Sequence, residues 1–127
     1  MGPRLLASAV LLFASLAVSG SASAHHNPKP MYESTSIMLT GTVTEFEWAN
    51  PHSIIAIAVK TDSGATQKWE AEFLPPAEMI RAGWTKETIH SGDQVTLTGL
   101  PGRHAQHILW LQSLVTADGR KLTRQHS

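Results

Sequence analysis

The chain has 127 residues with ten basic and ten acidic side chains, so its formal net charge is zero. This balance argues against a nucleic-acid-binding protein, which normally carries a basic face. The absence of cysteine excludes disulfides and thiolate metal sites, so any bound metal would need histidine nitrogen, carboxylate or backbone ligands.

Residues 1–24 have the three-part layout of a secretory signal peptide. Arg4 supplies the positive charge, an apolar stretch follows from Leu5 to Val18, and Ala22-Ser23-Ala24 fits the A-x-A cleavage pattern. The apolar stretch has about 14 residues, fewer than the roughly 20 that span a bilayer. We therefore expect a periplasmic or secreted protein that begins at or near His25 and has no membrane span after cleavage.

The mature chain begins with a polar segment that prolines interrupt. Residues 25–36 predict an extended arm, which Tyr32 or Met31 is expected to pin to the body of the protein. Residues 37–127 are predicted to form a single domain.

Five segments of this domain have the composition of β-strands, with alternating polar and apolar residues or β-branched runs. The predicted strands are Met38–Trp48, Ser53–Lys60, Thr66–Phe73, Gln94–Gly99 and Ile108–Val115. Gly41 is expected to mark a bulge or bend in the first strand. Trp69, Ala71 and Phe73 are expected to face the core, because they alternate with charged residues.

A short helix is predicted between the third and fourth strands. Pro75-Pro76 ends the third strand, and Ala77–Ala82 favours a helix. Thr85–Ile89 is expected to add a second helical turn. Near the end of the chain, Lys121-Leu122 is predicted to be a short strand or tail. The order of three strands, one helix and two strands indicates an all-β, five-stranded, OB-like Greek-key barrel. A small open β-sandwich is the alternative.

Several spaced segments form a distinctive pattern. They are His25-His26, Glu47–His52, Arg81–Thr85, Ser91–Val95 and Asp118–Leu122. These segments are spread over nearly the whole mature chain, and through them the sequence resembles the DUF6152 family of small exported bacterial proteins. The family pattern usually continues the histidine pair with serine and phenylalanine, whereas here Asn27-Pro28 follows. The resemblance implies an OB-like barrel, and it implies no particular activity, because none is established for the family.

The histidines provide the sharpest functional hypothesis. Cleavage after residue 24 would leave His25 with a free α-amine and a free imidazole, and a distant histidine would complete a three-nitrogen site called a histidine brace. Such a nitrogen-rich site favours copper. His52 is the first candidate partner, His26 is a further candidate ligand, and His104 and His107 could furnish a second ligand pair.

Glu47, Trp48 and Asn50 flank the turn that carries His52, so they are candidate residues around the metal or another ligand. The simpler interpretation is that the arm histidines are merely exposed and that His52 caps its turn through backbone hydrogen bonds. The sequence contains no recognisable catalytic motif.

Two functions follow from these patterns. The first is a binding or accessory module for a transition metal, copper first. The second is a metal-free interaction or structural module of the cell envelope, which would use the barrel face to contact an unknown envelope protein. An aromatic platform for nucleic acid is disfavoured, because the chain lacks the positive charge that such binding requires.

Overall fold

The computed structural model describes residue 2 and residues 31–124. These residues form six strands and one short helix: β1 (Ile37–Glu47), β2 (Ile54–Lys60), β3 (Thr66–Glu72), α1 (Pro76–Arg81), β4 (Gln94–Pro101), β5 (Ile108–Thr116) and β6 (Lys121–Thr123). The five long strands and the helix follow the predicted order, and the short segment near residue 121 is a strand.

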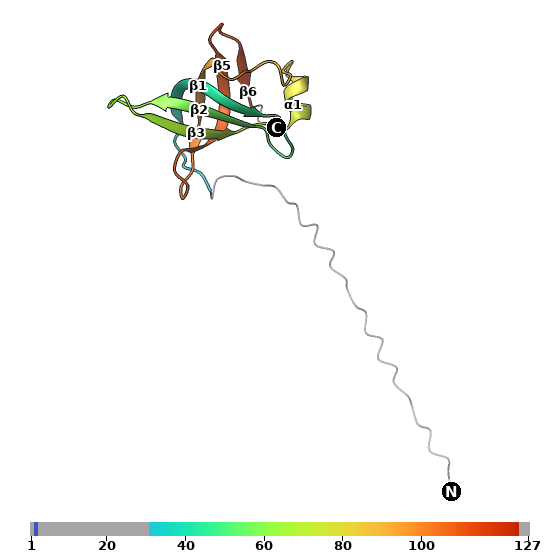
Figure 1. Cartoon of the computed structure of the whole chain (residues 1–127). Helices are drawn as coiled ribbons and strands as arrows, with labels where there is room; N and C mark the ends of the chain where they lie inside the picture. The colour runs from blue at the N-terminus through green and yellow to red at the C-terminus, as the bar shows by residue number, and fades with distance from the viewer. Residues whose placement is uncertain (1, 3–30, 125–127) are drawn as a thin grey trace.

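The strands form one sheet in the order β3-β2-β1-β4-β5-β6, with antiparallel neighbours. A parallel pairing of β3 with β5, from Glu70↔Ile108 to Glu72↔Trp110, closes this sheet into a barrel (Figure 1). The closure rules out the open sandwich and confirms the OB-like Greek-key barrel.

Side chains from every long strand fill the barrel. The fully or almost fully buried core residues include Val43, Ile55, Ile57, Ala71, Phe73, Val95, Leu97, Leu109, Leu111 and Leu114. Ala71 and Phe73 are buried as predicted, and Trp69 is partly buried against the same core. Period-two alternation therefore sorted the third strand correctly into inward and outward residues.

Helix α1 and the chain that follows it cover one end of this core. Proline at the first helical position and an acidic side chain in the first turn favour the helix start. Met79 from the helix, and Trp84 and Ile89 from the following segment, are at most 3% exposed. The predicted second helical turn at Thr85–Ile89 is wrong, because this segment consists of turns held by bonds such as that from the Thr88 amide to the Thr85 carbonyl.

The irregularity in β1 lies at a different residue from the one expected. The register between β1 and β2 shifts between Val43 and Glu45, so the bulge is not at Gly41. Gly41 instead permits close approach of two strands, since a Cβ there would lie 2.6 Å from the carbonyl oxygen of Ala58. Its lack of a side chain is needed for packing.

Two connections place the candidate ligands. The β1–β2 turn (48–53) carries His52, and the β4–β5 loop (102–107) carries His104 and His107. In Figure 1 the β4–β5 loop lies beside the chain that leads into β1, in agreement with a β-bridge between Tyr32 and Gly102. Over residue 2 and residues 31–124, no helix is long and apolar enough to cross a membrane.

Candidate functional site

His52 is held by a carboxylate from the neighbouring strand. Its Nδ1 lies 2.8 Å from Oε1 of Glu72, and both side chains are 34% exposed. An ionised carboxylate only accepts hydrogen bonds, so Nδ1 carries the proton and donates a hydrogen bond to Glu72. In the neutral ring the lone pair is then on Nε2, which is the nitrogen that a ligand would meet.

The other oxygen of the same carboxylate anchors the beginning of the described chain. The Tyr32 hydroxyl donates to Oε2 of Glu72 at 3.0 Å, and Tyr32 is only 7% exposed. Burial, followed by the charge of Glu72 and its hydrogen bond, raises the pKa of Tyr32 to about 12, while the charge of Arg124 opposes this rise. Glu72 therefore connects the arm to the β1–β2 turn.

Trp110 and Arg124 complete the group, which we call the Glu72 cluster (Tyr32, His52, Glu72, Trp110 and Arg124). The rings of Tyr32 and His52 each lie 5.6 Å from the ring of Trp110, and the Arg124 guanidinium lies 4.0 Å from the Trp110 ring centroid. Burial lowers the pKa of Arg124, whereas the negative charges of Glu78 and Glu72 oppose that shift. The cluster thus joins the arm, the β1–β2 turn, two strands and the C-terminal end of the described chain.

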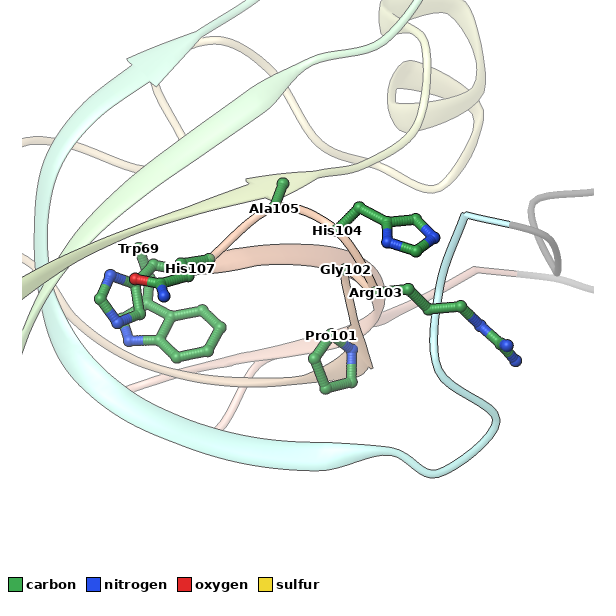
Figure 2. Close-up of a pocket in the computed structure, with 8 residues that line it drawn as sticks. Trp69, Pro101, Gly102, Arg103, His104, Ala105 and His107 are labelled. Carbon is green, nitrogen blue, oxygen red and sulfur yellow. The ribbon is translucent and has the colours of Figure 1, made fainter.

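The β4–β5 loop surrounds a separate hollow of about 390 Å³. Figure 2 shows His107 beside Trp69 on one side, with Arg103 and His104 on the opposite side. The rings of Trp69 and His107 have centroids 5.0 Å apart. His104 and His107 therefore do not point toward one another, although both lie in this loop.

The outer face of β1, β2 and β3 carries four carboxylates together with Lys68, which pairs with Glu70 at 3.0 Å. The strand register sets Glu45 and Glu70 on either side of Ala56. It likewise sets Glu47 and Glu72 on either side of Ile54. Directly opposite residues in a sheet share a face, so the four carboxylates lie on one surface.

The remaining predicted site residues have varied positions. Glu47 is exposed and lines a shallow depression on the outer face of the sheet. The ring of Trp48 packs edge-on against the ring of Phe46, with centroids 5.8 Å apart. Asn50 is exposed. His25 and His26 lie outside the described residues. Within the part of the chain that the structure describes, no group of three or more histidines and carboxylates is suited to hold a metal ion.

The sequence-based reasoning missed Glu72, Tyr32, Trp110 and Arg124 as members of one cluster with His52. One signal was present for Glu72. The Asp62–Gly64 turn sets Lys60 opposite Thr66, and the same register sets Ile54 opposite Glu72. Counting back along this hairpin would have placed the carboxylate close to His52.

Comparison with known proteins agrees with the fold and leaves the function open. A crystal structure of the mitochondrial single-stranded DNA-binding protein Rim1 from S. cerevisiae is similar with a TM-score of 0.50 and 13% identity, covering 65% of this chain and 93% of that chain. At this identity the similarity concerns the fold alone. No curated protein sequence matches the chain.

A family model agrees with the resemblance noted in the sequence. The model of a family of unknown function, DUF6152, matches residues 13–109, which is more than half of the chain. This chain therefore belongs to the DUF6152 family.

Proposed function

We propose that this protein is an exported binding module in which His52 and the N-terminal His25 together hold a transition-metal ion, copper first. The hydrogen bond between His52 Nδ1 and Glu72 is the observation that carries this proposal. Histidines that ligate metals usually donate their other ring N–H to a carboxylate, carbonyl or water, which fixes the ring and raises the basicity of the ligating nitrogen. His52 already has this arrangement.

The position of the arm supports His25 as the partner. Tyr32 binds the same carboxylate as His52, so this residue of the arm lies next to the candidate ligand. Seven residues of extended chain span at most about 24 Å. His25 is therefore close enough in sequence to reach His52, although it lies outside the described residues.

The chemistry of the available donors favours copper. After cleavage before His25, the α-amine and the imidazole of that residue would supply two nitrogens, and His52 Nε2 would supply the third. Nitrogen ligands in a near-planar arrangement suit Cu(II), which also has the highest affinity among the divalent first-row metals. His26 is the next candidate for the N-terminal donor.

The test is a copper titration of protein that has been exported to a bacterial periplasm and cleaved there, with the N-terminus verified by mass spectrometry. We expect one equivalent of Cu(II) to bind tightly, with nitrogen hyperfine structure in the electron paramagnetic resonance spectrum. His52→Ala should weaken binding at least tenfold. His90→Ala is the matched control, because His90 is exposed and contacts the carboxylate of Asp93, not that of Glu72.

Two further variants separate the parts of this site. Glu72→Gln should weaken copper binding by about 10–100-fold, because it removes the carboxylate that orients the His52 ring. An alanine inserted before His25 should abolish tight binding, because it removes the chelating amine from that residue. Copper binding that is equal in the wild type, His52→Ala and the alanine-extended protein would refute the proposal.

That negative result would favour the second candidate, a metal-free interaction module of the envelope that uses the barrel face. Nucleic acid is a poor partner in either case. The carboxylates of Glu45 and Glu47 would repel phosphates on the outer face of β1 to β3, where Lys68 is paired with Glu70. A pull-down with the exported protein would then be needed to find an envelope partner.

A further inference from the structure

The β4–β5 loop is fixed at both ends. The Gly102 amide donates to the carbonyl of Ile108 at 3.0 Å, and the Glu70 amide donates to the carbonyl of His107 at the same distance. The β-bridge from Tyr32 to Gly102 ties the loop to the arm as well. The hollow beside this loop is therefore formed before any ligand arrives.

One wall of the hollow is aromatic. His107 has a φ of 59°, a left-handed backbone conformation that non-glycine residues rarely adopt. This conformation accompanies the packing of its imidazole against Trp69, with the ring planes 51° apart. Strained residues of this kind cluster at binding sites, where the surrounding structure holds them in place.

Arg103 and His104 lie on the opposite side of the hollow, and their side chains extend outward from it (Figure 2). Arg103 donates from Nε to the carbonyl of Tyr32 at 2.7 Å, which fixes its side chain beside the arm. Arg103 makes no ion pair with a carboxylate among the described residues. His104 lies beside it, and no acidic residue lines the hollow.

We propose that this hollow binds a small anion that contains a ring, with the ring on Trp69 and His107 and the anionic group toward Arg103. The volume of about 390 Å³ is within the range of small-molecule sites. An aromatic carboxylate and a uronic acid share this chemistry, because each combines an apolar ring face with a carboxylate. The proposal does not rest on the copper site at His52, because no member of the Glu72 cluster lines the hollow.

The test is a titration of ¹⁵N-labelled protein, produced from the full-length coding sequence, with benzoate, galacturonate, benzyl alcohol and galactose. We expect at least one of the two anions to shift the Trp69 indole N–H and the His107 amide signals, and to bind at least tenfold more tightly than its neutral counterpart. Saturation by benzoate alone would identify an aromatic ligand. Saturation by galacturonate alone would identify an acidic sugar.

Three variants check the two walls. Arg103→Gln should weaken binding of the anion about tenfold, whereas Lys68→Gln, which removes an exposed charge outside the hollow, should change it less than twofold. His107→Gly should keep the backbone, because glycine accepts this φ, and should lose binding of the ring. The proposal is overturned if neither anion binds more tightly than its neutral counterpart, or if Arg103→Gln and Lys68→Gln weaken binding equally.

Discussion

Tyr32 is the only tyrosine of the chain, so its titration can be followed directly through the ultraviolet absorbance of tyrosinate. Burial and the neighbouring Glu72 raise the pKa of Tyr32 from 10.0 to about 12. Two pKa units correspond to about 2.7 kcal/mol as an upper limit, and solvent screening reduces this to about 1–2 kcal/mol. The hydroxyl of Tyr32 should thus contribute a measurable, pH-dependent part of the stability.

The direction of this effect follows from the raised pKa. The folded protein keeps the Tyr32 proton to higher pH than the unfolded chain, so the contribution is complete below about pH 10 and is lost as the pH rises toward about 12. Denaturant unfolding at a series of alkaline pH values should show this loss. The difference between the wild type and Tyr32→Phe isolates it from the titration of lysines.

Glu72→Gln tests the assigned causes. The variant should lower the pKa of Tyr32, because it removes a negative charge and the charged acceptor, yet the pKa should stay above 10 because burial is the largest cause. Two results together would refute the contact between the arm and Glu72. The tyrosinate absorbance of the folded protein would rise near pH 10, and the free energy of unfolding would change with alkaline pH equally in the wild type and in Tyr32→Phe.

Three further predictions concern the stability of the barrel, and urea unfolding measures each of them. Gly41→Ala should lower the free energy of unfolding by about 2–3 kcal/mol, because the new Cβ would collide with a backbone carbonyl. Gly64→Asn in the open hairpin turn should lower it by less than about 1 kcal/mol. Equal losses would contradict the close approach of the strands. Phe73→Ala should cost about 3–5 kcal/mol because Phe73 is fully buried, while the 70% exposed Met38 should tolerate alanine within about 0.5 kcal/mol. Ser53→Ala should stabilise the protein by about 1 kcal/mol, since the buried Oγ has no hydrogen-bond partner among the described residues, and a loss of stability would instead indicate a buried partner such as water.

The sequence was sufficient to predict the barrel because its local signals agree with one another. The strand alternation at Trp69, Ala71 and Phe73, the glycine turn at Gly64, and the proline pair at the start of α1 each indicate where an element begins or ends. The closure by β3 and β5 could be inferred only from the order of elements, since the paired residues are almost 40 positions apart. Agreement between local propensity and overall topology is what makes such an order informative.

Other features depend on contacts that no local pattern encodes. The bulge lies between Val43 and Glu45, just after the pairing of β1 with β4 ends at Thr42, and glycine at position 41 serves another purpose. The Glu72 cluster brings Tyr32 and Arg124 together from the two ends of the described chain. A single sequence contains no spacing signal for a meeting of this kind, and only the hairpin register pointed to Glu72.

The Glu72 cluster also separates two contributions to the proposed copper site. Glu72 orients His52 through Oε1 and anchors Tyr32 through Oε2, so the Tyr32 bond can be removed while the His52 bond is kept. Tyr32→Phe leaves the His52 bond in place but releases one attachment of the arm. If the arm brings His25 to the metal, Tyr32→Phe should weaken copper binding less than Glu72→Gln does, since the backbone bridge at Gly102 still holds the arm. In the alanine-extended protein, where His25 has lost its amine, Tyr32→Phe should have no further effect on copper. A Tyr32→Phe effect that persists in that background would mean that Tyr32 acts on His52 and not on the arm.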